Sequence, residues 1–424
     1  MAQNLAVESS TLPSGLRVVT DAMPGLATAS LGVFVAAGSR HEDEAEQGLS
    51  HLLEHMAFKG TRRRDARAIA QAIENAGGDL NAATSVEHTA FYARVLREDC
   101  GLALDVLSDI LTGSLFDPAE LEREKDVILQ EIAGLQDTPD EWAMDLFNAA
   151  AFPDQPIGRA ILGTPEKVRG FDRDAIEAYL NRHYGPGSLV VAAAGAVDHD
   201  EIRDLAARLF GDLPATAAPP AVGARYIGGE SLVTKKLEQT QVMLGFEGRS
   251  YSDPQNYAAH LFANAVGGGM ASPLFQEVRE KRGLAYSISA FHWAFLDSGL
   301  FGFEAATSAR QTRELVEVSL ACLAEAVERL GEDDLARAKA QTKVGLLTAL
   351  ESSAARAEQI ARQTMIFGHV LTREEMIRRI ESQSLAQVRA AGAAMLRTPP
   401  TVAILGAARK APGAAEAAAL LQGV

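Results

Sequence analysis

An internal repeat is the sequence feature that most constrains the fold of this chain. The apolar run at residues 241–246 resembles the run at 28–37, and residues 260–264 match 51–55. Further on, 335–339 match 121–125, and 400–406 match 187–195. The offsets agree to within a few residues, which indicates two copies of one domain. A chain of 424 residues is also too long for one typical core.

The predicted boundary between the copies is a change in composition. The stretch from Leu213 to Gly223 is rich in proline and alanine, which is typical of an interdomain linker. We therefore expect an N-terminal metal-binding domain at residues 1–213, a linker at 214–226 and a homologous domain without the metal motif at 227–424.

The first copy carries the pattern H-x-x-E-H at residues 51–55. On a helix, His51, Glu54 and His55 share one face, because successive residues are 100° apart. The apolar residues fall on the opposite arc: Leu49, Leu52, Leu53 and Met56. Two imidazoles one turn apart can hold a zinc ion, and a carboxylate between them can act as a general base toward water. The alternative is a surface helix with two solvated histidines.

A second helix predicted at residues 118–136 offers a third ligand. Asp117 and Pro118 are strong signals for the start of a helix. Glu124 and Glu131 are seven residues apart and so lie on one face. A carboxylate late in a helix is unfavourable for the helix dipole, which favours a metal-facing role for Glu131 over simple solvation.

The second copy keeps the apolar frame and loses the acidic and ligand positions. Glu54, His55, Glu124 and Glu131 correspond to Ala263, Asn264, Ala338 and Gly345. Solvated side chains without a function would give no reason for this contrast. The difference therefore favours a metal site in the first copy.

Composition limits the partners. The formal charge is −16, from 40 basic and 56 acidic residues, which disfavours nucleic acid as a partner. The two cysteines, Cys100 and Cys322, indicate neither a disulfide framework nor a thiolate metal site. We expect no membrane span and no targeting segment in the sequence as it stands. The expected location is the bacterial cytoplasm, with the mitochondrial matrix, as a processed form, as the alternative.

These motifs resemble those of the pitrilysin/insulinase family of zinc metallopeptidases. Within it, the chain is similar to the mitochondrial processing peptidase β subunit and its short bacterial relatives. The family has H-x-x-E-H followed by a glutamate ligand at the spacing that separates His55 from Glu131. The resemblance implies His51, His55 and Glu131 as ligands of one zinc ion, Glu54 as the catalytic base and Glu124 as support behind the ligands.

Two further segments carry the resemblance. Asn81 and Ala82 match the pair on the family's edge strand, which holds the substrate backbone by strand addition. Arg279 and Tyr286 match a pair that would steady the substrate carbonyl. Arg282 is a nearby alternative to Arg279.

The resemblance covers nearly the whole chain and implies an α+β fold. We expect two homologous domains, each an antiparallel sheet covered by helices, forming one half of a clamshell. The implied function is a zinc-dependent endopeptidase that cleaves peptides or unfolded, presequence-like segments inside a closed chamber. The implied partner is a second copy or a non-catalytic homologue. The alternative is a non-catalytic scaffold or a subunit that cleaves only with a partner.

Overall fold

The computed structural model describes residues 7–211, 213–214, 219–407 and 411–422, so part of the predicted linker lies outside the described residues. The chain forms two compact units. The first unit comprises Met1–Ala133, Ala160–Val222 and Leu347–Leu371, and the second comprises Gly134–Arg159, Gly223–Leu346 and Thr372–Val424. Each unit contains one β-sheet covered by helices, which confirms the α+β fold class.

The first unit contains a six-stranded sheet in the order β1-β2-β6-β3-β5-β4. All neighbouring strands are antiparallel except β2 and β6, which run parallel. The strands are β1 (Glu8–Thr11), β2 (Arg17–Ala22), β3 (Thr28–Val35), β4 (Asp79–Thr84), β5 (Thr89–Leu96) and β6 (Leu189–Gly195). The helices from the first half of the chain up to α4 are α1 (Leu49–Ala57), α2 (Ala66–Glu74), α3 (Cys100–Thr112) and α4 (Pro118–Leu135). Those after residue 160 are α6 (Pro165–Gly170), α7 (Arg173–His183) and α8 (His199–Phe210).

The second unit contains a five-stranded sheet in the order β7-β11-β8-β10-β9. Here too one pair is parallel, β7 with β11, and the others are antiparallel. The strands are β7 (Gly229–Thr234), β8 (Thr240–Glu247), β9 (Ala285–Ala294), β10 (Gly299–Thr307) and β11 (Thr401–Gly406). The helices are α9 (Asn256–Gly267), α10 (Pro273–Phe275), α11 (Thr312–Arg329), α12 (Glu332–Leu350), α14 (Arg373–Glu381), α15 (Leu385–Leu396) and α16 (Ala414–Gln422).

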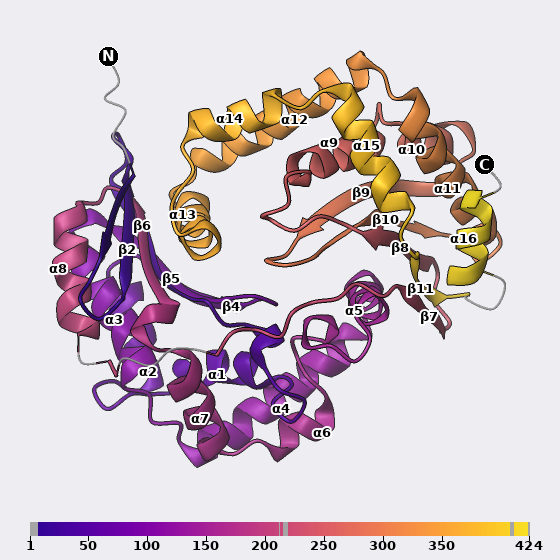
Figure 1. The fold of residues 1–424 in the computed structure, drawn as a ribbon. Coiled ribbons are helices and arrows are strands. Elements are labelled where there is room, and N and C mark those ends of the chain that lie inside the picture. The colour runs from indigo at the N-terminus through magenta and orange to yellow at the C-terminus, as the bar shows by residue number, and fades with distance from the viewer. Residues whose placement is uncertain (1–6, 212, 215–218, 408–410, 423–424) are drawn as a thin grey trace. The chain divides into compact units, whose positions relative to one another are not determined.

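Two helices cross the boundary that the repeat predicts. Helix α5 (Pro139–Ala151) comes from the first half of the sequence but packs on β11, β8 and β7. Helix α13 (Ser353–Phe367) comes from the second half but packs on β6, β3 and β2 (Figure 1). The compact units therefore differ from a division into contiguous residues 1–213 and 227–424, because each repeat places one helix on the sheet of the other.

Strand β3 is buried on both faces because helices cover both sides of the first sheet. Leu31, Val33 and Val35 point into a core formed with α1, α3 and α8. Phe34 points to the other side, where Ile360 and Ala361 of α13 cover it. The near-continuous apolar sequence of this strand follows from that double burial.

The predicted element boundaries around the motif are confirmed to within a few residues. The motif lies on α1, and the helix at Pro118 begins after Asp117, whose Oδ1 accepts from the backbone N–H groups of Ala119 (2.8 Å) and Glu120 (3.2 Å). Among the described residues, no helix is both long and apolar enough to cross a membrane.

Candidate metal centre

Helix α1 separates apolar side chains from the motif residues. Leu49, Leu52, Leu53 and Met56 are each at most 1% exposed. His51, Glu54 and His55 are half-buried on the remaining surface of the helix. The predicted division of the helix into an apolar face and a motif face is therefore confirmed.

The start of α1 is fixed by a residue outside the helix. Gly48 has φ +97°, and a Cβ there would lie 2.9 Å from the Leu162 carbonyl oxygen, so only glycine fits without strain. The buried Glu42 carboxylate accepts hydrogen bonds from the Gly48 N–H (2.9 Å), the Ser50 N–H (2.7 Å) and the Ser50 hydroxyl. It supplies the acceptors that the glycine cap lacks.

Glu131 brings a carboxylate from α4 to the two histidines. Its Oε2 lies 3.9 Å from Nε2 of His51 and 3.7 Å from Nε2 of His55. One ligand atom from each of the three residues lies within 4.8 Å of the others. Ligands at about 2.0–2.2 Å from zinc at tetrahedral angles lie roughly 3.4 Å apart, so a metal ion fits among these atoms after small shifts.

The histidines are suited to metal binding. Burial, with a smaller contribution from His55, lowers the pKa of His51 to about 4, so its ring is neutral at physiological pH. A neutral imidazole nitrogen is the form that binds a metal. Nε2 is the nitrogen of His51 that lies near Glu131, while Nδ1 is buried without a hydrogen-bond partner.

His55 is held from behind, unlike His51. Its Nδ1 lies 3.0 Å from Oε2 of Glu124, which fixes the ring orientation and directs Nε2 toward Glu131. The other oxygen of Glu124, Oε1, lies 2.6 Å from Nζ of Lys59. Glu124 is only 5% exposed, so both of its oxygens have partners in a buried position.

Glu54 lies next to the sheet. The Thr84 hydroxyl, at the end of β4, donates a hydrogen bond to Glu54 Oε2 (2.5 Å). Burial raises the pKa of the Glu54 carboxyl, and the bond from Thr84 opposes that rise. A carboxylate with a raised pKa is a stronger base near neutral pH.

Strand β4, which holds Asn81 and Ala82, is an edge strand of the six-stranded sheet. The Ala82 N–H donates to Oδ1 of its neighbour Asn81 (2.9 Å). Because Thr84 on this strand bonds to Glu54, the sheet edge and the motif helix are in direct contact. An extended peptide can pair with an edge strand of this kind.

Arg279 and Tyr286 belong to the second unit and contact each other there. Arg279 lies on a π-helical turn (Gln276–Lys281), and its guanidinium is 5.1 Å from the centre of the Tyr286 ring on β9. Tyr286 is 80% exposed, so it is not packed on the sheet. Arg282 instead pairs with Glu277, which leaves Arg279 as the cation on Tyr286.

The residues that the sequence aligns with the metal ligands form no such group in the second unit. Among the described residues, His51, His55 and Glu131 are the one set of three that could hold a metal ion. In α9, Ala263 is buried, and Oδ1 of Asn264 is buried without a partner.

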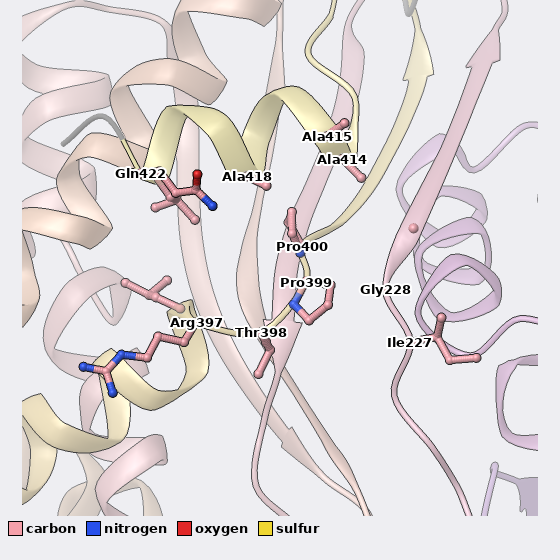
Figure 2. Close-up of a pocket in the computed structure, with 13 residues that line it drawn as sticks. Ile227, Gly228, Arg397, Thr398, Pro399, Pro400, Ala414, Ala415, Ala418 and Gln422 are labelled. Atoms are coloured by element: carbon pink, nitrogen blue, oxygen red, sulfur yellow. The ribbon is translucent and has the colours of Figure 1, made fainter.

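An open pocket in the second unit does not contain any predicted site residue. It has a volume of about 720 Å³ and lies where β7 and β11 begin, beside α16 (Figure 2). Its lining is mainly apolar, with Arg397 and Gln422 at one side, and includes no histidine, cysteine or carboxylate among the described residues. This pocket offers no group for metal binding or for general acid–base chemistry.

Comparison with known proteins agrees with this geometry. Residues 17–165 match the model of the insulinase family (peptidase family M16), and residues 170–342 match that of the peptidase M16 inactive domain. A protein of Rickettsia felis named "uncharacterized zinc protease" is 40% identical over 87% of this chain and 90% of its own length. The chain belongs to the M16 peptidase family. The expected family is thus confirmed.

Other M16 relatives carry the same name. An uncharacterized zinc protease of Streptomyces coelicolor is 38% identical over 94% of this chain and 89% of its own length. An uncharacterized zinc protease of Bacillus subtilis is 35% identical over 89% of this chain and 93% of its own length. The crystal structure of a peptidase M16 inactive domain from Pseudomonas fluorescens shares the fold, with a TM-score of 0.87 over 95% of this chain and 98% of that chain, at 22% identity.

Sequence reasoning missed three residues that surround the motif: Glu42, Lys59 and Thr84. Lys59 is four residues after His55, a spacing that places two side chains on one side of a helical turn, so the sequence held a signal for it. Glu42 and Thr84 are joined to α1 only by tertiary contacts, and no local pattern marks them.

Proposed function

We propose that this chain is a zinc-dependent endopeptidase that acts on peptides or unfolded segments. The observation that carries the proposal is the convergence of His51 Nε2, His55 Nε2 and Glu131 Oε2, with Glu54 on the same helix as the histidines. A zinc ion bound there would supply Lewis-acid activation of the scissile carbonyl and of a water molecule. The names of the bacterial relatives support zinc as the metal.

The residues of the chain divide the work. Glu54 would take a proton from the attacking water and then deliver it to the leaving amine. Thr84 orients the Glu54 carboxylate through its hydrogen bond. Glu124 orients His55 in the same way.

Strand β4 is the proposed binding edge for the substrate backbone. A substrate carbonyl bound to the Ala82 N–H would take the place of the Asn81 side chain, which is its acceptor here. Binding through backbone groups favours extended and unfolded segments over folded ones. The roles of Arg279 and Tyr286 toward the substrate remain predictions from the resemblance.

Glu54→Gln tests the proposal. The purified wild type should contain about one zinc per chain and cleave a quenched fluorescent peptide containing arginine. Glu54→Gln should keep the zinc and lose at least about 100-fold in kcat/KM, because an amide cannot accept the proton. Glu120→Gln, a half-buried change at the start of α4 that affects only the pair with Arg123, should behave like the wild type.

The outcomes separate the alternatives. Cleavage by Glu54→Gln at the wild-type rate would contradict the proposal. Zinc in both proteins without cleavage by either would instead support a subunit that needs a partner, and adding a candidate homologue would then be the next test. Absence of zinc from both would favour the non-catalytic scaffold.

A further inference from the structure

We infer that Lys59 is a positioning residue of the metal centre, acting on His55 through Glu124. The chain of contacts is direct: Lys59 Nζ lies 2.6 Å from Glu124 Oε1, and Glu124 Oε2 lies 3.0 Å from His55 Nδ1. The inference deepens the proposed function and takes from it only that His51, His55 and Glu131 hold the metal.

Glu124 is buried, so its carboxylate needs a partner such as Lys59. Glu124 is 5% exposed, and a buried carboxylate is costly unless its oxygens are paired. Each of its oxygens has its own partner: Oε2 contacts His55, which faces the metal site, and Oε1 contacts Lys59. With Lys59 on Oε1, the carboxylate plane is fixed and Oε2 is left for the histidine.

The charges around the site point the same way. Three carboxylates, those of Glu54, Glu124 and Glu131, lie around the two histidines. Lys59 brings a positive charge, so that the ionised carboxylates, the lysine and a divalent cation together are neutral. Without Lys59, this cluster would carry an uncompensated negative charge in a half-buried position.

The local fold explains why the lysine is at this position. Helix α1 ends at Ala57, and the Lys59 N–H still donates to the Met56 carbonyl (3.2 Å), which continues the turn past the end of the helix. A cation is favourable at the C-terminus of a helix. Because Lys59 follows His55 by four residues, its side chain lies on the same side of the turn as the His55 imidazole.

Zinc affinity is the readout, measured by competition with a chromophoric chelator, because it does not depend on peptidase activity. Lys59→Met should weaken zinc binding by about 10-fold to 100-fold, as expected when the support of a ligand is lost. Lys59→Arg, which keeps the cation, should stay within about threefold of the wild type. Thermal unfolding of the metal-free proteins checks that each variant is folded.

Lys125→Met is the matched control. Lys125 lies on α4 next to Glu124, is more buried than Lys59, and pairs with Glu122 instead (2.7 Å). Its loss should leave zinc affinity unchanged. Introducing Lys59→Met into Glu124→Gln should add little, because the lysine acts through that carboxylate.

The inference is overturned if Lys59→Met binds zinc as tightly as the wild type, or if Lys59→Met and Lys125→Met weaken binding equally. It is also overturned if the losses in the double variant add in full. A wild type that binds one zinc but cleaves no peptide would contradict the proposed function and leave the zinc comparison decisive. A wild type that binds no zinc would overturn both.

Discussion

The two compact units place corresponding strands in the same order, β2-β6-β3-β5-β4 in the first and β7-β11-β8-β10-β9 in the second. In each, the parallel pair has the same place, and a helix from the other repeat covers the sheet. Their chemistry differs: α1 presents His51, Glu54 and His55, while α9 keeps the first histidine, as His260, and has Ala263 and Asn264 at the other two aligned positions. The apolar pattern specifies the fold in both units, and a few polar positions decide which unit has a group of side chains that could hold a metal ion.

Removing a ligand should give the largest difference between the units. His55→Ala deletes one of three converging donors and should reduce zinc content from about one per chain to near zero after dialysis, with an affinity loss above about 100-fold. Asn264→Ala, the aligned change in α9, should leave the zinc content at the wild-type value. Elemental analysis of both purified variants makes the comparison, and equal loss in both would contradict the assignment of the site to the first repeat.

The exchanged helices should differ in how strongly they are anchored. Arg356 of α13 bonds to Asp21 of β2 (2.5 Å), and Arg356 is 7% exposed. Arg356→Met leaves a carboxylate without its buried partner and should lower the free energy of unfolding by about 3–5 kcal/mol. Urea unfolding followed by circular dichroism measures this change.

The counterpart in the second unit is a partly exposed contact between Lys235 and the Trp142 ring of α5, at 4.6 Å from its centre. Lys235→Met should cost less than about 1 kcal/mol, because cation–π contacts that solvent reaches are weak. Equal losses in the free energy of unfolding for Arg356→Met and Lys235→Met would contradict the expectation that the more buried contact stabilises its helix more.

The carboxyl group that caps α1 should make the stability of the chain depend on pH. Burial raises the pKa of Glu42, which caps α1, to about 7, although its three hydrogen bonds oppose the rise. Between about pH 4.5 and 7 the folded chain therefore keeps a proton that the unfolded chain loses, so stability falls as pH rises, by roughly 3 kcal/mol at most. Glu42→Gln should remove this slope, because an amide does not titrate.

In the second unit, Asp253 lies in the loop before α9, the helix that corresponds to α1. Its Oδ1 accepts a hydrogen bond from the Gln255 N–H (2.7 Å) in an exposed position. Asp253→Asn is the matched control variant. Thermal unfolding at several pH values measures both variants, and an unchanged slope in Glu42→Gln would refute the role of its buried carboxyl.

The motif helix and the start of α4 could be predicted from the sequence because each rests on local periodicity and helix-start signals. The choice of Glu131 as the third ligand rested on its place late in α4 and on the resemblance to the family. His51, His55 and Glu131 come together as the resemblance to the family implied. The exchange of α5 and α13 could not be predicted, because both helices have ordinary amphipathic sequences and the sheet that each covers is decided by tertiary packing. The place of Lys59 near His55 could have been predicted from helical spacing. The contacts of Glu42 and Thr84 with α1 could not, because they arise only from tertiary packing.

The central claim is that one metal ion binds in the first repeat and none in the second. A crystal structure of the zinc-loaded chain, with anomalous data collected at the zinc edge, tests it most directly. We predict one anomalous peak per chain, about 2.0–2.2 Å from His51 Nε2, His55 Nε2 and a Glu131 oxygen. A peak beside Asn264 in α9, or none between the three predicted ligands, would contradict the account.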